Sequence, residues 1–253
     1  MSDTDLLLLV AVLLPPTALD IFGEFVEERI ISTPYGEVGP LACRKPDGGP
    51  DVWIQPYTGL PTRTDPRATI FAARELGLTR ILNWDTGVAL NPVLHRGQSL
   101  IVEDYVDWTR NQPNSFLSDG LHGRQVDEID SRPAFCPQLT GALRSLLPDA
   151  PGIVYLGVDG PRRETPAEAR MFRAWGMDVI GQNLVPEVAL AQELGICYTG
   201  LVTVDAHAAD RPAWVVDGEV RESLGATIRA LPALLPSIAG QPECSCRGRL
   251  GSD

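Results

Sequence analysis

The sequence predicts an α/β fold with a mixed or parallel central sheet flanked by helices. The chain has 253 residues, a length that suits one large α/β domain or two small ones. Its hydrophobic content of 44% is enough for a substantial core. In the second half, short apolar runs alternate with helix-like segments, an order typical of a mixed or parallel sheet with helices on both faces.

The first half of the chain is expected to supply several strands and one helix. Leu6 to Leu14 is an apolar run, which we interpret as a buried strand that ends before Pro15-Pro16. Asp65-Pro66 opens a helix, because aspartate caps well and proline fits the first helical position, and Gly77 suits the position after its end. Further strands are expected at Val26–Ser32, Asp51–Gln55, Thr79–Leu82 and Ser99–Val106.

The second half is expected to begin with a loop and to continue as alternating helices and strands. Residues 108–133 are polar and rich in Gly, Pro and Asp, which predicts a long loop. A final helix is expected over about 218–235, where Pro232 kinks or restarts it. The elements between these are expected at Gln138–Leu147, Ile153–Val158, Pro166–Trp175, Asp178–Ile180, Pro186–Leu194 and Ile196–Val204.

The charge of the chain limits its partners. The formal net charge is −12 and the pI is about 4.7, so a nucleic acid would be repelled, and a small neutral substrate or a protein partner fits better. The apolar run Leu6–Leu14 is too short to span a bilayer. Asp3 and Asp5 precede it in place of the cations of a signal peptide. We therefore expect a cytoplasmic protein that does not enter a membrane.

Five cysteines are present, and most stand alone in apolar segments. This usage fits a reducing compartment. Cys244 and Cys246 are separated by one residue near the C-terminus, and two thiols alone are too few for a structural zinc site. They are either incidental thiols of a frayed tail or a local redox or locking pair, and the residues do not decide between these readings. Neither a metal nor an organic cofactor is predicted.

The turns that follow the strands are the expected place for a site, because ligands bind at the carboxyl ends of strands in such sheets. The turn Asp159–Glu164 is fixed by a capping box that begins at Thr165. Gln182-Asn183 follows another apolar strand, and Asp205 closes a third. These polar residues can bind a ligand, but by themselves they are also what ordinary turns and helix caps contain.

Three segments carry a family resemblance. Gly160 begins Gly-Pro-Arg-x-Glu-Thr-Pro-Ala-Glu, and Met171 begins Met-Phe-Arg-x-Trp-Gly-x-Asp-Val-Ile-Gly. Val185 begins Val-Pro-Glu-Val-x-Leu-Ala-x-Glu-x-Gly-Ile-Cys-Tyr. In these motifs the chain strongly resembles the 5′-methylthioadenosine phosphorylase and purine nucleoside phosphorylase family, and Phe135-Cys136-Pro137 and the Cys-x-Cys tail are similar to segments of that family.

The resemblance implies a single α/β domain with a mixed, barrel-like central sheet flanked by helices. This nucleoside phosphorylase-like domain is expected over residues 1–240, with a tail over 241–253 and assembly as a homotrimer or hexamer. It implies a pentosyltransferase that cleaves the N-glycosidic bond of a purine nucleoside, with phosphate as nucleophile and without a metal or organic cofactor. The transition state resembles an oxocarbenium ion, so positive charge on the sugar and negative charge on the purine must be stabilised.

On the base side, the resemblance assigns purine recognition to Glu164, whose carboxylate can accept from a purine N–H. Arg163 stands where the family has an aromatic residue that stacks on the base, and a guanidinium plane can also stack. Asp205 is the expected proton donor to the purine if the alignment shifts by one residue, since an ungapped alignment places Ala206 there. His207 and Asp210 are weaker substitutes for that role.

On the phosphate side, the chain departs from the family pattern. Pro15-Pro16 stands in place of a glycine-rich loop, and Pro56-Tyr57-Thr58-Gly59 in place of Arg-His-Gly. Trp84-Asp85 replaces a Thr-Ala pair, and Gln182-Asn183 replaces Met-Thr or Met-Ser. A carboxylate ~4 Å from one phosphate charge costs about 4 kcal/mol at an effective dielectric near 20, roughly a thousandfold in affinity. Arg63 or Arg67 would have to compensate.

These residues leave several functions open. The expected function is purine-nucleoside processing at the N-glycosidic bond, with Trp84, Asp85, Gln182, Asn183 and His207 expected among the substrate-binding residues. Because the phosphate ligands are replaced, phosphorolysis is disfavoured. The alternatives are a phosphate-independent nucleosidase, an enzyme repurposed for a biosynthetic step, and a relative that binds a ligand without catalysis.

Overall fold

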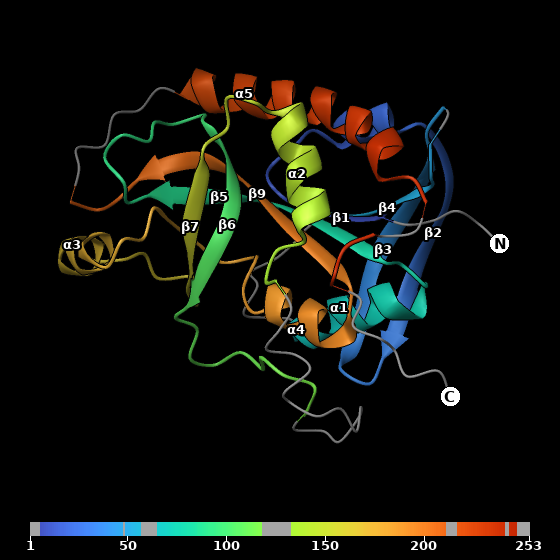
Figure 1. The fold of residues 1–253 in the computed structure, drawn as a ribbon, viewed down its shortest axis with the longest axis horizontal. Helices are drawn as coiled ribbons and strands as arrows, with labels where there is room; N and C mark the ends of the chain where they lie inside the picture. The colour runs from blue at the N-terminus through green and yellow to red at the C-terminus, as the bar shows by residue number, and fades with distance from the viewer. Residues whose placement is uncertain are drawn as a thin grey trace.

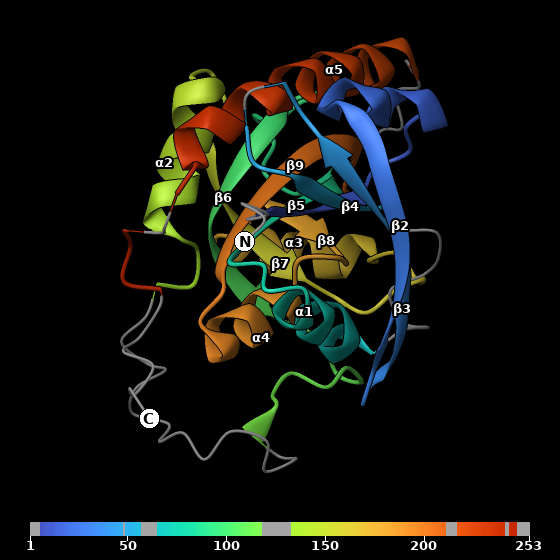
Figure 2. The same ribbon diagram turned by 90° about the vertical axis from the view of Figure 1, so that its right-hand side faces the viewer.

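A closed barrel of five strands forms the centre of the computed structural model, which describes residues 6–47, 49–56, 65–117, 133–210, 217–240 and 243–246. The strands follow one another around the barrel in the order β5, β8, β7, β6 and β9, and β9 pairs with β5 to close it (Figures 1 and 2). Two of the pairings, β5–β8 and β6–β9, are antiparallel. The mixed, barrel-like sheet predicted from the sequence is therefore confirmed. The barrel strands are β5 (Arg80–Ala89), β6 (Ser99–Asp107), β7 (Gly152–Gly157), β8 (Val179–Gly181) and β9 (Cys197–His207).

Four further strands extend the sheet on one side of the barrel. β1 (Leu6–Ala11) lies between β5 and β4 (Val52–Pro56) and is parallel to both. β3 (Gly36–Lys45) pairs with β4, and β2 (Glu24–Thr33) forms the outer edge. Figure 2 shows the β2–β3 hairpin standing away from the barrel at the side of the molecule. β2 is largely exposed, in keeping with its place at the edge.

Helices cover the sheet on opposite sides (Figures 1 and 2). α5 (Asp217–Ala230) and the 3₁₀ segment η5 (Leu231–Ile238) run along one side, next to α2 (Pro137–Leu146). α1 (Pro66–Glu75) packs beside α4 (Glu187–Leu194) on the other. The remaining helical segments are η1 (Pro16–Phe22) and α3 (Pro166–Ala174). Within the described ranges, no helix has the length and apolar character needed to cross a membrane.

β1 is buried on both faces, which explains its unbroken apolar sequence. Leu7 and Leu9 belong to a core cluster on one side of the sheet, whereas Leu6, Leu8 and Val10 belong to a cluster on the other. Full burial of each leucine side chain contributes about 1.5–3 kcal/mol. The strand thus joins the two halves of the core.

The structure corrects the predicted bounds of three strands. β1 ends at Ala11, and Leu13 is 95% exposed, because the chain leaves the sheet before Pro15-Pro16 rather than at it. β5 and β9 continue past Leu82 and Val204, where polar residues had suggested turns. Both strands have partners on each side, and this pairing outweighs the local preference of the polar residues.

β3 was not predicted at all. It contains glycines and Pro40, which break the apolar alternation by which a strand is recognised. The predicted helix at Asp65-Pro66 is confirmed, since Asp65 accepts from the backbone N–H of Arg67 and Gly77 has a φ of 73°. The final helix is restarted at Pro232, as predicted, where α5 gives way to η5.

Candidate active site

Two neighbouring cavities lie where the chain leaves β7 and β8. The first, which we call the central pocket, has a volume of about 200 Å³, and the second, which we call the aromatic pocket, about 210 Å³. They share Val158, Arg162, Glu164 and Ile180, so together they reach the size of an ordinary small-molecule site. The central pocket is lined by Asp85, Thr86, Gly87, Val88, Val158, Arg162, Arg163, Glu164, Ile180, Gly181, Gln182, Asn183 and Asp205.

Asp85 is fixed at the wall of the central pocket by hydrogen bonds from several elements. Its Oδ2 accepts from the Tyr155 hydroxyl at 2.7 Å, and its Oδ1 accepts from the Asn183 side chain at 2.7 Å and the Thr86 backbone at 2.8 Å. The backbone N–H groups of Gln182 and Asn183 also point to Oδ2, at 3.4 and 3.3 Å. These donors occupy the lone pairs of the carboxylate, so Asp85 organises the turn and has little capacity left to accept a proton from a ligand.

Burial raises the pKa of Asp85 to about 6, although the hydrogen bonds from Tyr155 and Asn183 oppose the shift. Near neutral pH the carboxyl is therefore mostly ionised. Burial, together with the charge of Asp85, raises the pKa of Tyr155 well above its ordinary value, so Tyr155 stays a proton donor to Asp85. A negative charge thus stands in a pocket wall where the family resemblance places phosphate.

The Gln182-Asn183 turn is also held from β5 by a second side chain. The amide of Asn83 donates to the Asn183 carbonyl at 2.5 Å and to the Tyr198 hydroxyl at 2.8 Å. Asn83 is fully buried. The turn is therefore anchored by two polar side chains of β5, Asn83 and Asp85, which hold its backbone in a fixed position.

Glu164 lies beside the pocket mouth with its side chain only 5% exposed. Its Oε1 accepts from the backbone N–H of Ala209 at 2.8 Å and from Arg163 at 3.4 Å. Arg163 is 60% exposed and also donates to the His207 carbonyl at 3.0 Å. In the part of the chain that the structure describes, the hydrogen bonds of Glu164 use Oε1, which leaves Oε2 to accept from a ligand N–H.

Asp205 lies near the end of β9 and lines the central pocket. Burial is the main cause of its raised pKa, which Arg163 and Arg96 partly oppose. A carboxyl with a raised pKa holds its proton at higher pH, which is the property that a general acid needs. Asp205 also lines a larger, mostly apolar cavity of about 660 Å³ beside α5, so it stands between two spaces.

Trp84, His207 and Asp210 lie apart from this arrangement. Trp84 is fully buried in the core and donates its indole N–H to Thr203 at 3.0 Å. It is not among the residues lining the central pocket, and neither is His207, whose backbone carbonyl accepts from Arg163. Asp210 is paired with Arg173 at 2.8 and 2.9 Å, an interaction that lowers its pKa. Of the three expected proton donors, Asp205 alone lines the central pocket.

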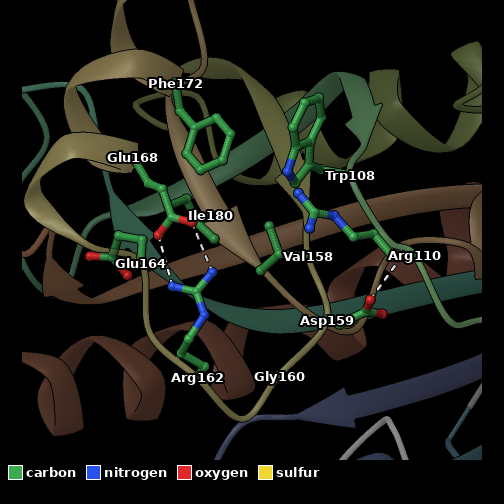
Figure 3. Close-up of a pocket in the computed structure, with 10 residues that line it drawn as sticks. All are labelled: Trp108, Arg110, Val158, Asp159, Gly160, Arg162, Glu164, Glu168, Phe172 and Ile180. Atoms are coloured by element: carbon green, nitrogen blue, oxygen red, sulfur yellow. Dashed lines mark hydrogen bonds and ion pairs between the residues drawn. The ribbon is translucent and has the colours of Figure 1, made fainter.

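The aromatic pocket contains residues that the sequence reasoning did not single out (Figure 3). Trp108 and Phe172 meet edge to face with ring centroids 5.8 Å apart. Below them, Arg162 forms a bidentate ion pair with Glu168, with both N–O distances 2.8 Å. Tyr155 was also missed, although a tyrosine within an apolar strand needs a buried partner for its hydroxyl, and that need is the signal that points to Asp85.

The expected phosphate side contains no arginine cluster among the residues that the structure describes there. Pro15 precedes the 3₁₀ segment η1 after β1. Arg67 pairs with Asp65 at 2.8 Å and stacks over the ring of Tyr35 at 4.4 Å, so its guanidinium is engaged. Residues 57–64, which include Arg63 and most of Pro56-Tyr57-Thr58-Gly59, lie outside the described residues. Within the central pocket, Arg162 and Arg163 are themselves paired with glutamates.

Known proteins match this chain over most of its length. A family model described as "Phosphorylase superfamily" matches residues 22–235. A relative from Dictyoglomus turgidum named "Probable 6-oxopurine nucleoside phosphorylase" is 33% identical over 244 residues, covering 90% of this chain and 91% of the relative. A Pyrococcus horikoshii protein named "S-methyl-5'-thioadenosine phosphorylase" is 31% identical over 242 residues. The matched region covers 89% of this chain and 92% of that protein.

A solved structure agrees in fold. The methylthioadenosine phosphorylase sourced from an antarctic soil metagenomic library superposes with a TM-score of 0.82 at 20% sequence identity, covering 96% of this chain and 90% of the other. The family match and the two sequence relatives extend through the motifs that carry the resemblance. The chain therefore belongs to the phosphorylase superfamily, among the purine nucleoside and methylthioadenosine phosphorylases, which are pentosyltransferases.

Proposed function

We propose that this protein cleaves the N-glycosidic bond of a purine nucleoside and that it does so without depending on phosphate. The relatives named above are purine and methylthioadenosine phosphorylases, which supports purine-nucleoside processing. The observation that carries the second half of the proposal is Asp85, a buried carboxylate saturated with hydrogen bonds in the wall of the central pocket. A phosphate there would meet an acid that is fixed in place.

Glu164 and Asp205 are proposed to handle the base. Oε2 of Glu164 accepts an N–H of the purine, while the exposed guanidinium of Arg163 stacks on its plane. Asp205 donates a proton to the ring nitrogen as the bond to the sugar breaks, so the purine leaves as a neutral molecule. Its burial supports this role, because the resulting rise in pKa keeps the proton available.

Asp85 is proposed to act on the sugar by charge. An ionised carboxylate disfavours an incoming anion by about 4 kcal/mol at ~4 Å and an effective dielectric near 20. The same charge favours a sugar that becomes positive in the transition state. Water is neutral and does not meet this penalty, so it is the proposed nucleophile. Gln182 and Asn183, which Asp85 holds in place, are proposed to orient the sugar.

The experiment follows free base by chromatography after incubation with adenosine, inosine or methylthioadenosine, with and without phosphate. We expect release of base at a similar rate in both conditions. Glu164→Gln and Asp205→Asn should lower that rate, while Asp210→Asn, at an ion pair that does not line the central pocket, serves as the matched control. A rate that rises more than about tenfold with phosphate would contradict the phosphate-independent route.

A non-catalytic nucleoside-binding protein is the second candidate, and the engaged state of Asp85, Arg162 and Arg163 favours it. Calorimetry separates the candidates, because binding of a nucleoside without release of base supports this second function. Neither binding nor release would reject both. A role in a biosynthetic step on a nucleoside-like molecule is the further alternative, and turnover of such a molecule would identify it.

We also propose that the protein is cytoplasmic, as its cysteine usage suggests, and that it assembles as a homotrimer or hexamer, as its family resemblance implies. Light scattering coupled to size-exclusion chromatography gives the assembly directly from the molar mass. A monomer at micromolar concentration would reject the proposed assembly.

A further inference from the structure

Four of the five cysteines, drawn from three segments that are far apart in the sequence, meet in one place. Cys136 is the residue before α2, Cys197 opens β9, and Cys244 and Cys246 come from the segment near the C-terminus. Their sulfurs all lie within 4.8 Å of one another, and those of Cys197 and Cys244 are 3.2 Å apart. We call this group the thiol cluster. All four are unbridged thiols in the structure.

The spacing of the thiol cluster suits a single tetrahedral metal ion. Zinc binds thiolates at about 2.3 Å, so the sulfurs around one zinc ion stand about 3.8 Å apart. The sulfurs of the thiol cluster all lie within 4.8 Å of one another and the Cys197–Cys244 pair lies at 3.2 Å, so the spacing of a zinc site falls within this range. Among the described residues, these four cysteines are the group of potential metal ligands whose donor atoms lie close enough together to share one ion. Four thiolates in a tetrahedron are a donor set used for zinc and for iron–sulfur sites, and a single Zn²⁺ ion fits four sulfurs this close together.

The surroundings support ionised sulfurs at this position. Cys136 stands at the N-terminus of α2, a ten-residue helix whose partial positive charge favours a thiolate. The negative charge of thiolates bound to a metal is therefore partly offset at this end of the helix.

The chain around the thiol cluster is held in place by other bonds. The backbone N–H of Cys136 donates to the Tyr198 carbonyl at 2.7 Å, which ties α2 to β9. The backbone N–H of Glu243 donates to the side chain of Gln138 at 3.1 Å, which ties the C-terminal segment to α2. Cys136, Cys197 and Cys246 are buried, and Cys244 is partly exposed, which leaves a route for an ion to enter.

From this geometry we propose that Cys136, Cys197, Cys244 and Cys246 bind one structural Zn²⁺ ion. The ion would join α2, β9 and the C-terminal segment into one unit, and its four protein ligands would leave no position open for substrate. Cys197 and Asp205 lie at opposite ends of β9, roughly 26 Å apart at the rise of an extended strand. The zinc site is thus separate from the central pocket.

The test measures zinc in the full-length protein, produced in zinc-supplemented medium and purified with a thiol reductant. Elemental analysis should give about one zinc ion per chain after dialysis. Cobalt(II) loaded into the metal-free protein should give the intense visible bands of a tetrahedral thiolate site. Cys244→Ser changes the one partly exposed ligand, and it should lower the zinc retained at least tenfold while the circular dichroism stays unchanged.

The matched control is Cys43→Ser, because Cys43 is also buried but lies on β3 outside the thiol cluster. That variant should keep its zinc. Zinc content that is equal in wild type and Cys244→Ser would overturn the proposal. So would a zinc-free reduced protein that takes up no zinc or cobalt, or a protein from unreduced extract in which mass spectrometry finds these four cysteines joined as disulfides.

Discussion

Asp85 is the residue on which the arrangement of the central pocket depends most. Its carboxylate accepts from Tyr155 in β7, from the Gln182-Asn183 turn after β8 and from Thr86 in its own strand. Loss of this one acid removes partners from three elements at once, and buried donors left without partners are costly. The residue therefore combines a structural task with the charge that we propose to exclude phosphate.

Asp85 should make the free energy of unfolding depend on pH in a defined window. Its pKa is 3.8 in its ordinary state and about 6 when folded, so the folded protein binds the extra proton between these values. Protonated Asp85 therefore adds its full stabilisation below pH about 4. As the pH rises through about 6 that stabilisation is lost, and the free energy of unfolding falls by roughly 3 kcal/mol. Urea denaturation from pH 4 to 8 should show this fall in the wild type.

The variant Asp85→Asn cannot ionise, so its unfolding free energy should lack this component. The exposed Asp149 provides the control, and Asp149→Asn should follow the wild-type curve. Parallel curves for wild type and Asp85→Asn would show that Asp85 does not titrate between pH 4 and 6.

Asp205 should control the alkaline limb of activity. As a general acid it must be protonated, so the rate of base release should fall as pH rises through its raised pKa. In Asp205→Asn the rate should drop by roughly 10²–10⁴-fold, and that alkaline limb should disappear. Steady-state rates across pH, with inosine as substrate, measure both effects. A variant that keeps the wild-type pH profile would place the proton donor elsewhere.

At the scale of elements, β1 shows that the place of an apolar residue relative to the end of its strand decides whether the residue is buried and contributes to stability. Leu9 and Leu13 belong to one unbroken apolar run, yet Leu9 is fully buried and Leu13 is 95% exposed. The difference arises because β1 ends at Ala11, between the two. The run alone cannot reveal where the strand stops, since each residue in it has the same preference for burial.

This difference gives a paired prediction for stability. Leu9→Ala should lower the free energy of unfolding by about 2–5 kcal/mol, because it leaves a cavity beside β4 and β5. Leu13→Ala should change it by less than about 0.5 kcal/mol. Chemical denaturation of both variants checks the pair. A similar loss in both would mean that Leu13 is covered in solution, for instance by a second chain.

At the scale of the whole molecule, closure of the barrel depends on close approach at Gly87. A Cβ atom at this position would meet the side chains of Val179 in β8 and Val202 in β9. The absence of a side chain lets β5 pair with both strands at once. Gly87 is thus a packing residue within β5.

Gly87→Ala should therefore destabilise the protein by about 1–3 kcal/mol through overpacking. Gly141 is the matched control, because it lies in α2 with open space where its Cβ would stand. Gly141→Ala should be stabilising by about 0.4–1 kcal/mol, since alanine favours the helix. Thermal or urea unfolding compares the two. Equal losses would show that β5 is not constrained at Gly87.

Strand–helix alternation predicted a mixed or parallel sheet with a site at the turns after its strands, because alternation and turn residues are local signals. The family resemblance implied the barrel and put Asp85, Glu164, Gln182, Asn183 and Asp205 among the expected site residues. The sequence did not predict that Trp84 turns into the core, since neighbouring residues of a strand face opposite sides and the strand was thought to end before it. It also could not reveal the partner of Tyr155 or the meeting of Cys136 with Cys246, because those contacts depend on long-range topology.

β9 carries Cys197 at one end and Asp205 at the other, and between them it is hydrogen-bonded to both β5 and β6. A strand that is paired on both edges cannot shift along its length without breaking the hydrogen bonds to its neighbours. A structural change at Cys197 is therefore not transmitted along β9 as a movement of Asp205. Loss of metal should then make the molecule easier to unfold without altering the protonation of Asp205, and evolution could modify either end while leaving the other intact.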